Sequence, residues 1–171
     1  EQQKVYDDIL ELMRKNRFAE CLVHGITGSG KTELYLQLIS ETIASGGDAL
    51  LLVPEISLTP QMTAHFRRRF GENVAVLHSR MSDGERNLQW NKIKNGAVSV
   101  AVGARSAIFA PFRRLRLIIL DEEHEPSYYS EDAAPHYHAA EIAETIGRIR
   151  NAVVLYGSAT PRVETYYRAV R

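Results

Sequence analysis

The sequence GITGSGKT, at residues 25–32, decides the fold class of this chain, because it fits the pattern GxxxxGK[ST] without a mismatch. An apolar run at residues 21–23 precedes it, and a helical pattern at residues 33–44 follows it. The glycines therefore fall at a strand-to-helix turn, where backbone N–H groups can face phosphate oxygens and the helix N-terminus adds partial positive charge. This context predicts a phosphate-binding loop, and the alternative is a glycine-rich turn that fits the pattern by chance.

Within this loop the residue types suggest separate roles. Lys31 supplies a positive charge for the β- and γ-phosphates, and the Thr32 hydroxyl is a ligand for the Mg²⁺ that bridges them. The rest of the loop is expected to surround the phosphates, through Gly25, Thr27, Gly28, Ser29 and Gly30. We therefore predict ATP and Mg²⁺ as the cofactors.

Size and composition favour one soluble domain in a reducing, cytoplasmic setting. The chain has 171 residues, of which 44% are hydrophobic, and this suffices for a single core. Its one cysteine, Cys21, excludes a disulfide framework or a thiolate zinc site built from this chain. No apolar run is long enough to span a membrane, so we expect no membrane partner. The net charge is zero, so any nucleic-acid site must be local.

Apolar runs of strand length alternate with helical patterns along the whole chain. Strands are predicted at residues 21–23, 49–53, 74–77, 98–103, 117–120 and 153–156. Helices are predicted over the opening segment (Val5, Ile9, Leu12, Met13), over 33–44, over 60–70 after a Thr59 cap, over 82–94 with a Ser82/Glu85 capping box, around Ile142, Ile146 and Ile149, and from Thr160 and Pro161 onward. Unbroken apolar strands separated by helices indicate a mostly parallel α/β sheet with helices on both faces. Because the chain starts inside a helical pattern, we expect it to be part of a longer protein.

A second chemical feature is LIILDEEH at residues 117–124, where a predicted buried strand ends in acidic residues. Open α/β sheets bind ligands at the carboxyl ends of their strands. Asp121 is expected to hold Mg²⁺, and Glu122 is expected to orient or deprotonate the water that attacks the γ-phosphorus. The alternative is an acidic loop after a core strand.

Together with SAT at residues 158–160, these stretches resemble motifs I, II and III of superfamily-two helicases. Four further stretches resemble the primosomal replication-restart helicases, the primosomal protein N′ family: VPEISLTPQ (53–61), LHSRMSDGER (77–86), GARSAIFAPF (103–112) and YGSATP (156–161). The resemblance covers nearly the whole chain and implies the first RecA-like motor lobe, residues 1–171. It implies an ATP-dependent DNA helicase that acts in replication restart, with single-stranded or forked DNA and other primosome proteins as partners.

The same resemblance implies parts outside this chain: a second motor lobe with its arginine finger, a zinc-binding cysteine-rich insertion and an N-terminal DNA-binding region. It assigns Lys31 and Thr32 to phosphate and metal, and Asp121 and Glu122 to metal and water. It also implies that His124, Ser158 and Thr160 couple nucleotide state to DNA. From the residues alone, SAT after a strand is only a helix cap and turn. Gln2 falls where the adenine-contacting glutamine is expected, and Gln3 is a rival for that role.

The expected DNA contacts lie in two of these stretches. Residues 54–61, with Thr59, and Arg105 with Ser106 match motifs that follow the phosphates of a single strand. Helix N-termini and an arginine at a strand end can bind phosphates without reading bases. The alternative is that Arg105 is a solvated loop charge and Thr59 only a helix cap. The three arginines at 67–69 are interpreted as a solvated helix face.

The segment 122–137 has no periodicity and is long for a loop in a compact domain. It holds Tyr128, Tyr129 and Tyr137, which we expect to stack on single-stranded bases beside the ATP site, as the resemblance implies. The alternative is that these rings pack partly into the core.

Two other functions remain open from the sequence. A small-molecule P-loop kinase would keep the phosphate loop but would show an arginine-rich lid instead of DEEH followed by SAT. A non-catalytic DNA- or protein-binding module would keep the fold without using Lys31 or Glu122 in chemistry. ATP hydrolysis measured with and without single-stranded DNA separates the three.

Overall fold

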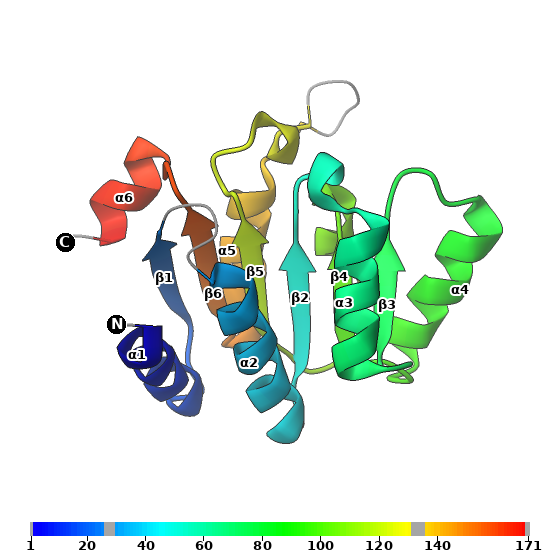
Figure 1. The fold of residues 1–171 in the computed structure, drawn as a ribbon, viewed down its shortest axis with the longest axis horizontal. Helices are drawn as coiled ribbons and strands as arrows, with labels where there is room; N and C mark the ends of the chain where they lie inside the picture. The colour runs from blue at the N-terminus through cyan, green and yellow to red at the C-terminus, as the bar shows by residue number, and fades with distance from the viewer. Residues whose placement is uncertain (1, 26–29, 131–135, 170–171) are drawn as a thin grey trace.

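Six parallel strands form one sheet at the centre of the molecule (Figure 1). The structure, a computed structural model, describes residues 2–25, 30–130 and 136–169, with Gln2 described by its backbone only. The strand order is β1-β6-β5-β2-β4-β3. The strands are β1 (Ala19–His24), β2 (Asp48–Leu52), β3 (Val74–Leu77), β4 (Val100–Gly103), β5 (Leu115–Asp121) and β6 (Val153–Ser158). Because all neighbouring pairs are parallel, the carboxyl ends of the strands meet at one edge of the sheet.

Helices cover both faces of this sheet (Figure 1). They are α1 (Gln2–Arg14), α2 (Lys31–Ala44), α3 (Pro60–Phe70), α4 (Asp83–Lys94), α5 (Ala139–Arg150) and α6 (Val163–Ala169), with short 3₁₀ helices η1 (Glu55–Ser57), η2 (Arg105–Phe109) and η3 (Pro126–Tyr128). Side chains of α1, α2 and α3 pack on one face of the sheet, and those of α4, α5 and η2 pack on the other. No helix within the described ranges is long and apolar enough to cross a bilayer.

The two cores use alternate residues of the same strands. In β2, Ala49 and Leu51 join the core under α2, while Leu50 and Leu52 join the core under α5 and η2. All five residues of β2 are buried, as a central strand covered on both faces requires. The predicted parallel α/β fold is therefore confirmed, with strand ends that differ from the predicted ones by at most two residues.

Local sequence signals set the start of two helices as predicted. The Thr59 hydroxyl accepts a hydrogen bond from the Met62 N–H at 3.2 Å, and Pro60 is the first residue of α3. Before α4, the Ser82 hydroxyl accepts from the Glu85 N–H, and the Glu85 carboxylate accepts from the Ser82 N–H. Both bonds of the capping box are thus present, and they satisfy amide groups that the helix itself leaves unpaired.

Helix α5 is present as predicted, and Ile142 and Ile146 are partly buried against the core. Its buried residues are Ala139, Ala140, Ala143 and Gly147, whereas Ile149 is 73% exposed. The reason is close packing on β6: a Cβ on Gly147 would lie 2.7 Å from a Val154 methyl and 3.0 Å from the Phe18 ring. Small residues therefore face the sheet.

The last helix also starts later than predicted, at Val163 instead of directly after Thr160 and Pro161. The Thr160 N–H donates to the Ser158 hydroxyl at 3.1 Å, which holds the SAT segment in a turn. The Arg162 N–H donates to the Glu123 carboxylate at 2.7 Å, so a residue distant in sequence supports the start of α6.

Candidate nucleotide-binding site

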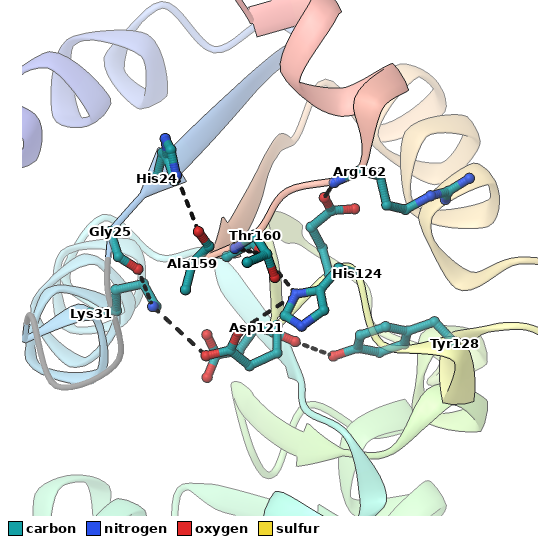
Figure 2. Close-up of polar contacts among 12 residues, drawn as sticks. His24, Gly25, Lys31, Asp121, His124, Tyr128, Ala159, Thr160 and Arg162 are labelled. Atoms are coloured by element: carbon teal, nitrogen blue, oxygen red, sulfur yellow. Dashed lines mark hydrogen bonds and ion pairs between the residues drawn. The ribbon is translucent and has the colours of Figure 1, made fainter.

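The predicted phosphate-binding lysine lies at the carboxyl edge of the sheet, as the first residue of α2. Lys31 is 9% exposed, and its Nζ donates to the Gly25 carbonyl at 2.7 Å. The same Nζ lies 3.7 Å from Oε1 of Glu122, at the end of β5 (Figure 2). Gly30, which precedes Lys31, has a left-handed φ of 86°, a conformation that glycine adopts at low cost. The two predicted catalytic stretches are thus joined by a salt bridge.

Other predicted nucleotide contacts are only partly described. The Thr32 side chain is exposed in the first turn of α2. Thr27, Gly28 and Ser29 lie outside the described residues, as does the side chain of Gln2. The rival Gln3 donates from Nε2 to the Asp7 carboxylate at 3.0 Å, one helical turn further along α1.

Asp121, the last residue of β5, accepts a hydrogen bond at Oδ1 from the Tyr35 hydroxyl at 2.9 Å. Burial raises the pKa of Asp121 above its ordinary value, and the charge of Glu122 adds to this rise, while the Tyr35 hydrogen bond opposes it. Gly157 in β6 leaves room for this contact, since a Cβ there would overlap the Tyr35 hydroxyl. One carboxylate oxygen is therefore fixed by the protein.

Glu122 adopts a left-handed backbone with φ 47°, which is unusual for a residue with a side chain. Its carbonyl accepts from the Glu125 N–H at 2.9 Å, which closes a tight turn after β5. Its carboxylate lies between two basic groups, Lys31 and His124, each at 3.7 Å. Backbone strain of this kind persists where the surrounding structure imposes it, and it is common in catalytic sites.

His124 connects this turn to the SAT segment on β6. Its Nδ1 lies 2.7 Å from the Ser158 hydroxyl, which is buried and accepts from the Thr160 N–H (Figure 2). The Ser158 carbonyl accepts from the Gly25 N–H at 3.1 Å. The three residues predicted to couple nucleotide state to DNA are thus in direct contact, and Ser158 also contacts the start of the phosphate loop.

Sequence reasoning missed Glu123, whose side chain is 0% exposed. Its carboxylate accepts from the Arg162 N–H at 2.7 Å and from the Thr165 hydroxyl at 3.2 Å, and its own N–H donates to the Gly157 carbonyl. A buried carboxylate requires such donors. The sequence did contain a signal for it. Of the three acidic residues in DEEH, Asp121 was assigned to the metal and Glu122 to the water, which left Glu123 without a role.

We call residues 126–138 the tyrosine loop. Of its three tyrosines predicted to contact DNA, Tyr128 is buried, so this prediction is wrong. Tyr128 is 1% exposed and donates its hydroxyl to the Asp121 carbonyl at 2.7 Å, so it is a core residue that supports the end of β5 (Figure 2). Burial raises the pKa of its phenol. Its ring has no exposed face on which a base can stack, because it is part of the hydrophobic core under α5 and η2.

The other two tyrosines of this loop keep part of their surface accessible. Tyr129 is 43% exposed and stacks on His138, with ring centroids 6.5 Å apart. Tyr137 is half-buried and meets the edge of Phe109 at 5.2 Å. Backbone bonding joins the two sides of the loop, since the Ser130 N–H donates to the Tyr137 carbonyl at 2.9 Å.

Arg105, a predicted phosphate contact, holds this loop. Its guanidinium donates to the carbonyl oxygens of Ser127 and Tyr129 and lies 5.8 Å from the centre of the Tyr137 ring. Within the part of the chain that the structure describes, its buried Nε has no hydrogen-bond partner. The other two predicted phosphate contacts have accessible side chains. Ser106 is exposed next to Arg105 in η2, and Thr59 is exposed at the start of α3.

Comparison with known proteins gives the family. Residues 1–169 match the DEAD/DEAH box helicases. The chain belongs to this family. It is 51% identical over 169 residues to the replication restart protein PriA of Bacillus subtilis, covering 99% of this chain and 21% of the relative. It is 44% identical over 170 residues to PriA of Chlamydia pneumoniae, covering 99% and 23%. The predicted resemblance to replication-restart helicases is confirmed, and the chain spans about a fifth of the length of these relatives.

Solved structures support the fold assignment. The Pyrococcus furiosus Hef helicase domain aligns with a TM-score of 0.65 at 22% identity, over 99% of this chain and 34% of that one. RecG bound to a three-way DNA junction aligns with a TM-score of 0.66 at 24% identity, over 98% and 22%. These similarities confirm the RecA-like fold of this helicase-family chain.

The residues predicted to bind Mg²⁺ suit that ion. Mg²⁺ is usually bound by one or two protein oxygens together with substrate phosphates and water. Thr32 offers an exposed hydroxyl, and Asp121 offers the carboxylate oxygen that Tyr35 leaves free. Consistent with so few protein ligands, no group of three or more His, Cys, Asp or Glu side chains suited to a metal lies within residues 2–25, 30–130 and 136–169.

Proposed function

We propose that this chain is the ATP-binding motor lobe of an ATP-dependent DNA helicase that acts in replication restart in the cytoplasm. The observation that carries the proposal is the continuous path Lys31–Glu122–His124–Ser158, which joins the phosphate loop to the SAT segment. Phosphate transfer to a small molecule does not require the contacts Glu122–His124 and His124–Ser158, so this path favours the helicase over a small-molecule kinase. A second motor lobe, a zinc-binding insertion and a DNA-binding region would belong to the rest of a longer protein, and primosome proteins would be further partners.

The geometry supports separate roles in hydrolysis. Lys31 would hold the β- and γ-phosphates, and its salt bridge to Glu122 would then weaken because the phosphates compete for the same charge. Glu122 would take a proton from the attacking water. Thr32 and Asp121 would hold Mg²⁺, which neutralises charge on the phosphates when it is bound. Glu122 thus changes partner when nucleotide enters.

This change of partner would pass to the DNA side through His124. A Glu122 carboxylate released by Lys31 is free to interact more strongly with His124, 3.7 Å away. His124 is bonded to Ser158, whose hydroxyl also orients the Thr160 N–H. Single-stranded or forked DNA bound beyond the SAT segment would therefore be linked to the state of the nucleotide.

The test is ATP hydrolysis by the intact gene product that carries this chain, with and without single-stranded DNA. Glu122→Gln should keep Mg²⁺-dependent ATP binding and lower DNA-stimulated turnover about 10²- to 10⁴-fold, because an amide keeps the shape but cannot take the proton. Glu164→Gln, at an exposed site on α6, is the matched control and should leave turnover unchanged. Normal turnover by Glu122→Gln would show that Glu122 has no catalytic role. An unchanged rate of ATP hydrolysis on addition of single-stranded DNA would favour a different P-loop enzyme.

A further inference from the structure

A cavity of about 350 Å³ lies between α4 and η2, at the carboxyl ends of β3 and β4, away from the phosphate loop. It is lined by Leu77, Arg86, Asn87, Trp90, Ser106 and Phe109, among others. The volume falls in the range of small-ligand sites, which is about 300–1,000 Å³. The cavity therefore has room for one planar group and not for a duplex.

The lining combines aromatic surface with polar groups. Trp90 is half-buried and Phe109 is 47% exposed, which is high for a phenylalanine. Arg86 and Asn87 add a positive charge and an amide next to them. Aromatic rings with arginine and amide groups form the type of surface on which unpaired bases stack and form hydrogen bonds.

The position of the cavity points to a base that belongs to a strand. Ser106 also lines a neighbouring cavity that contains Arg105, Ser79 and Tyr129. Arg105 lines this second cavity, and among the described residues its buried Nε has no hydrogen-bond partner, which is costly unless a ligand or water can reach it and accept the bond. Phosphate oxygens are strong acceptors for guanidinium groups. The two cavities are thus suited to a phosphate and an adjacent base.

We propose that one unpaired nucleobase of the bound DNA strand enters the cavity between Trp90 and Phe109. The proposal rests on the proposed function and adds a base contact to it. Phe109 links the cavity to the tyrosine loop, because its ring meets Tyr137 edge-on at 5.2 Å. Arg105 lies 5.8 Å from the same Tyr137 ring and bonds the loop carbonyls. A base in the cavity therefore contacts Phe109. Through Tyr137 and Arg105, Phe109 is connected to the loop that follows β5.

Trp90 makes the proposal directly measurable, since it is the only tryptophan of the chain. We would titrate the 171-residue chain, at low salt, with a dT oligomer of about ten nucleotides, a length within single-strand site sizes. Trp90 fluorescence reports occupancy of the cavity, and anisotropy of a dye on the oligomer reports binding. An abasic oligomer of equal length presents the phosphates without bases, and dTMP at equal base concentration presents a base without a strand.

The expected result is quenching of Trp90 by the dT oligomer and little quenching by the abasic oligomer or by dTMP. Phe109→Ala should weaken dT binding about fivefold or more and leave abasic binding unchanged. Ile149→Ala, at a site 73% exposed on α5, is the matched control and should change neither. Circular dichroism of Phe109→Ala checks that the fold is retained.

Several results would overturn the proposal. Equal quenching by abasic DNA would reduce the site to phosphate binding, and equal quenching by dTMP would make it a free-nucleotide site. Anisotropy that reports binding while Trp90 fluorescence stays constant would leave the helicase proposal intact and exclude the base site. A lack of any DNA binding by both the chain and the intact gene product would reject the two proposals together. Loss of binding to a partner protein in Phe109→Ala, with DNA binding unchanged, would assign the cavity to protein.

Discussion

The nucleotide site and the tyrosine loop lie at the same edge of the sheet but use their polar side chains in different ways. At the nucleotide site, the Glu122 carboxylate lies 3.7 Å from Lys31 and 3.7 Å from His124. At the loop, Arg105 of η2 donates to the Ser127 carbonyl, and Tyr128 of the loop donates to the Asp121 carbonyl. In the first region the charged side chains contact one another, whereas in the second the polar side chains bond backbone carbonyls.

The difference arises from how each region is built. The nucleotide site stands on strand ends whose positions are fixed by register: Asp121 pairs with Gly157, and His24 pairs with Ser158. Among the described residues of the loop, the only ladder is one bridge between Tyr129 and His138, and side chains such as Arg105 also hold the loop. The sheet sets the geometry of a site on paired strands, whereas a loop held by few backbone bonds and by Arg105 can change when that arginine finds another acceptor.

The largest expected effect is the difference in ATP turnover between the isolated 171-residue chain and the intact gene product. Its two arginines nearest the motifs are engaged elsewhere: Arg105 bonds the loop, and Arg162 lies 3.1 Å from the His138 Nε2. Arginine fingers are worth about 10³- to 10⁵-fold in turnover where they have been studied, and we expect a second lobe to supply one here. Phosphate release by the 171-residue chain should therefore be lower than that of the intact gene product by about this factor. Equal, DNA-stimulated rates would show that the nucleotide site is complete within this chain.

Lys31→Ala tests the nucleotide site itself. The change removes a buried charge that we propose holds the terminal phosphates, and we expect a loss of Mg²⁺-dependent ATP binding and a fall in turnover of the intact gene product of about 10²-fold or more. Calorimetry at low salt measures the affinity. Lys94→Ala, on the exposed end of α4, serves as the control. Affinity that stays the same would end the assignment of Lys31.

Arg105→Ala tests whether the loop is held as the contacts indicate. Hydrogen bonds to charged groups contribute about 1.5–3 kcal/mol, so loop opening should become about ten- to a hundredfold more frequent. Amide exchange of Ser130, whose N–H bonds the Tyr137 carbonyl, is the measurement. Arg113→Ala, which removes an exposed bond to the Lys94 carbonyl, is the control. If Ser130 exchange were unaltered, Arg105 would not hold the loop, and the contrast between the two regions would weaken.

The smallest expected effect is the change that Asp121→Asn makes in the free energy of unfolding, and this change depends on pH. Burial raises the pKa of Asp121 in the folded chain, so the ionised carboxylate lowers stability at neutral pH, and this penalty disappears as pH falls through the raised pKa. Asparagine keeps an oxygen for the Tyr35 hydroxyl without the charge. The free energy of unfolding should rise at neutral pH, and the gain should shrink in acid.

Urea unfolding at a series of pH values measures this gain, with Asp8→Asn on the exposed side of α1 as the control. The same Asp121→Asn variant should lose Mg²⁺-dependent turnover in the intact gene product, since an amide is a weaker ligand for the ion. A variant that is less stable at neutral pH, with the fold retained, would contradict the proposed cost of the buried charge.

The sequence by itself determined the features that depend on local pattern and on strand order. The phosphate loop, the Thr59 cap, the Ser82 capping box and the six buried strands follow from short-range chemistry and from apolar runs. Because parallel strands place their carboxyl ends at one edge, the meeting of Lys31 with Glu122 also followed from sequence. These features need no knowledge of distant loops.

Only the tertiary structure decided which side chains are satisfied inside the protein. Tyr128 is buried, Arg105 binds loop carbonyls and Glu123 supports α6, although nothing local distinguishes these residues from exposed ones. The small buried face of α5 and the late start of α6 likewise depend on Phe18 and Glu123, which are far away in sequence. The physical reason is that burial and hydrogen-bond pairing are set by neighbours that the folded sheet brings together, and a local pattern does not contain them.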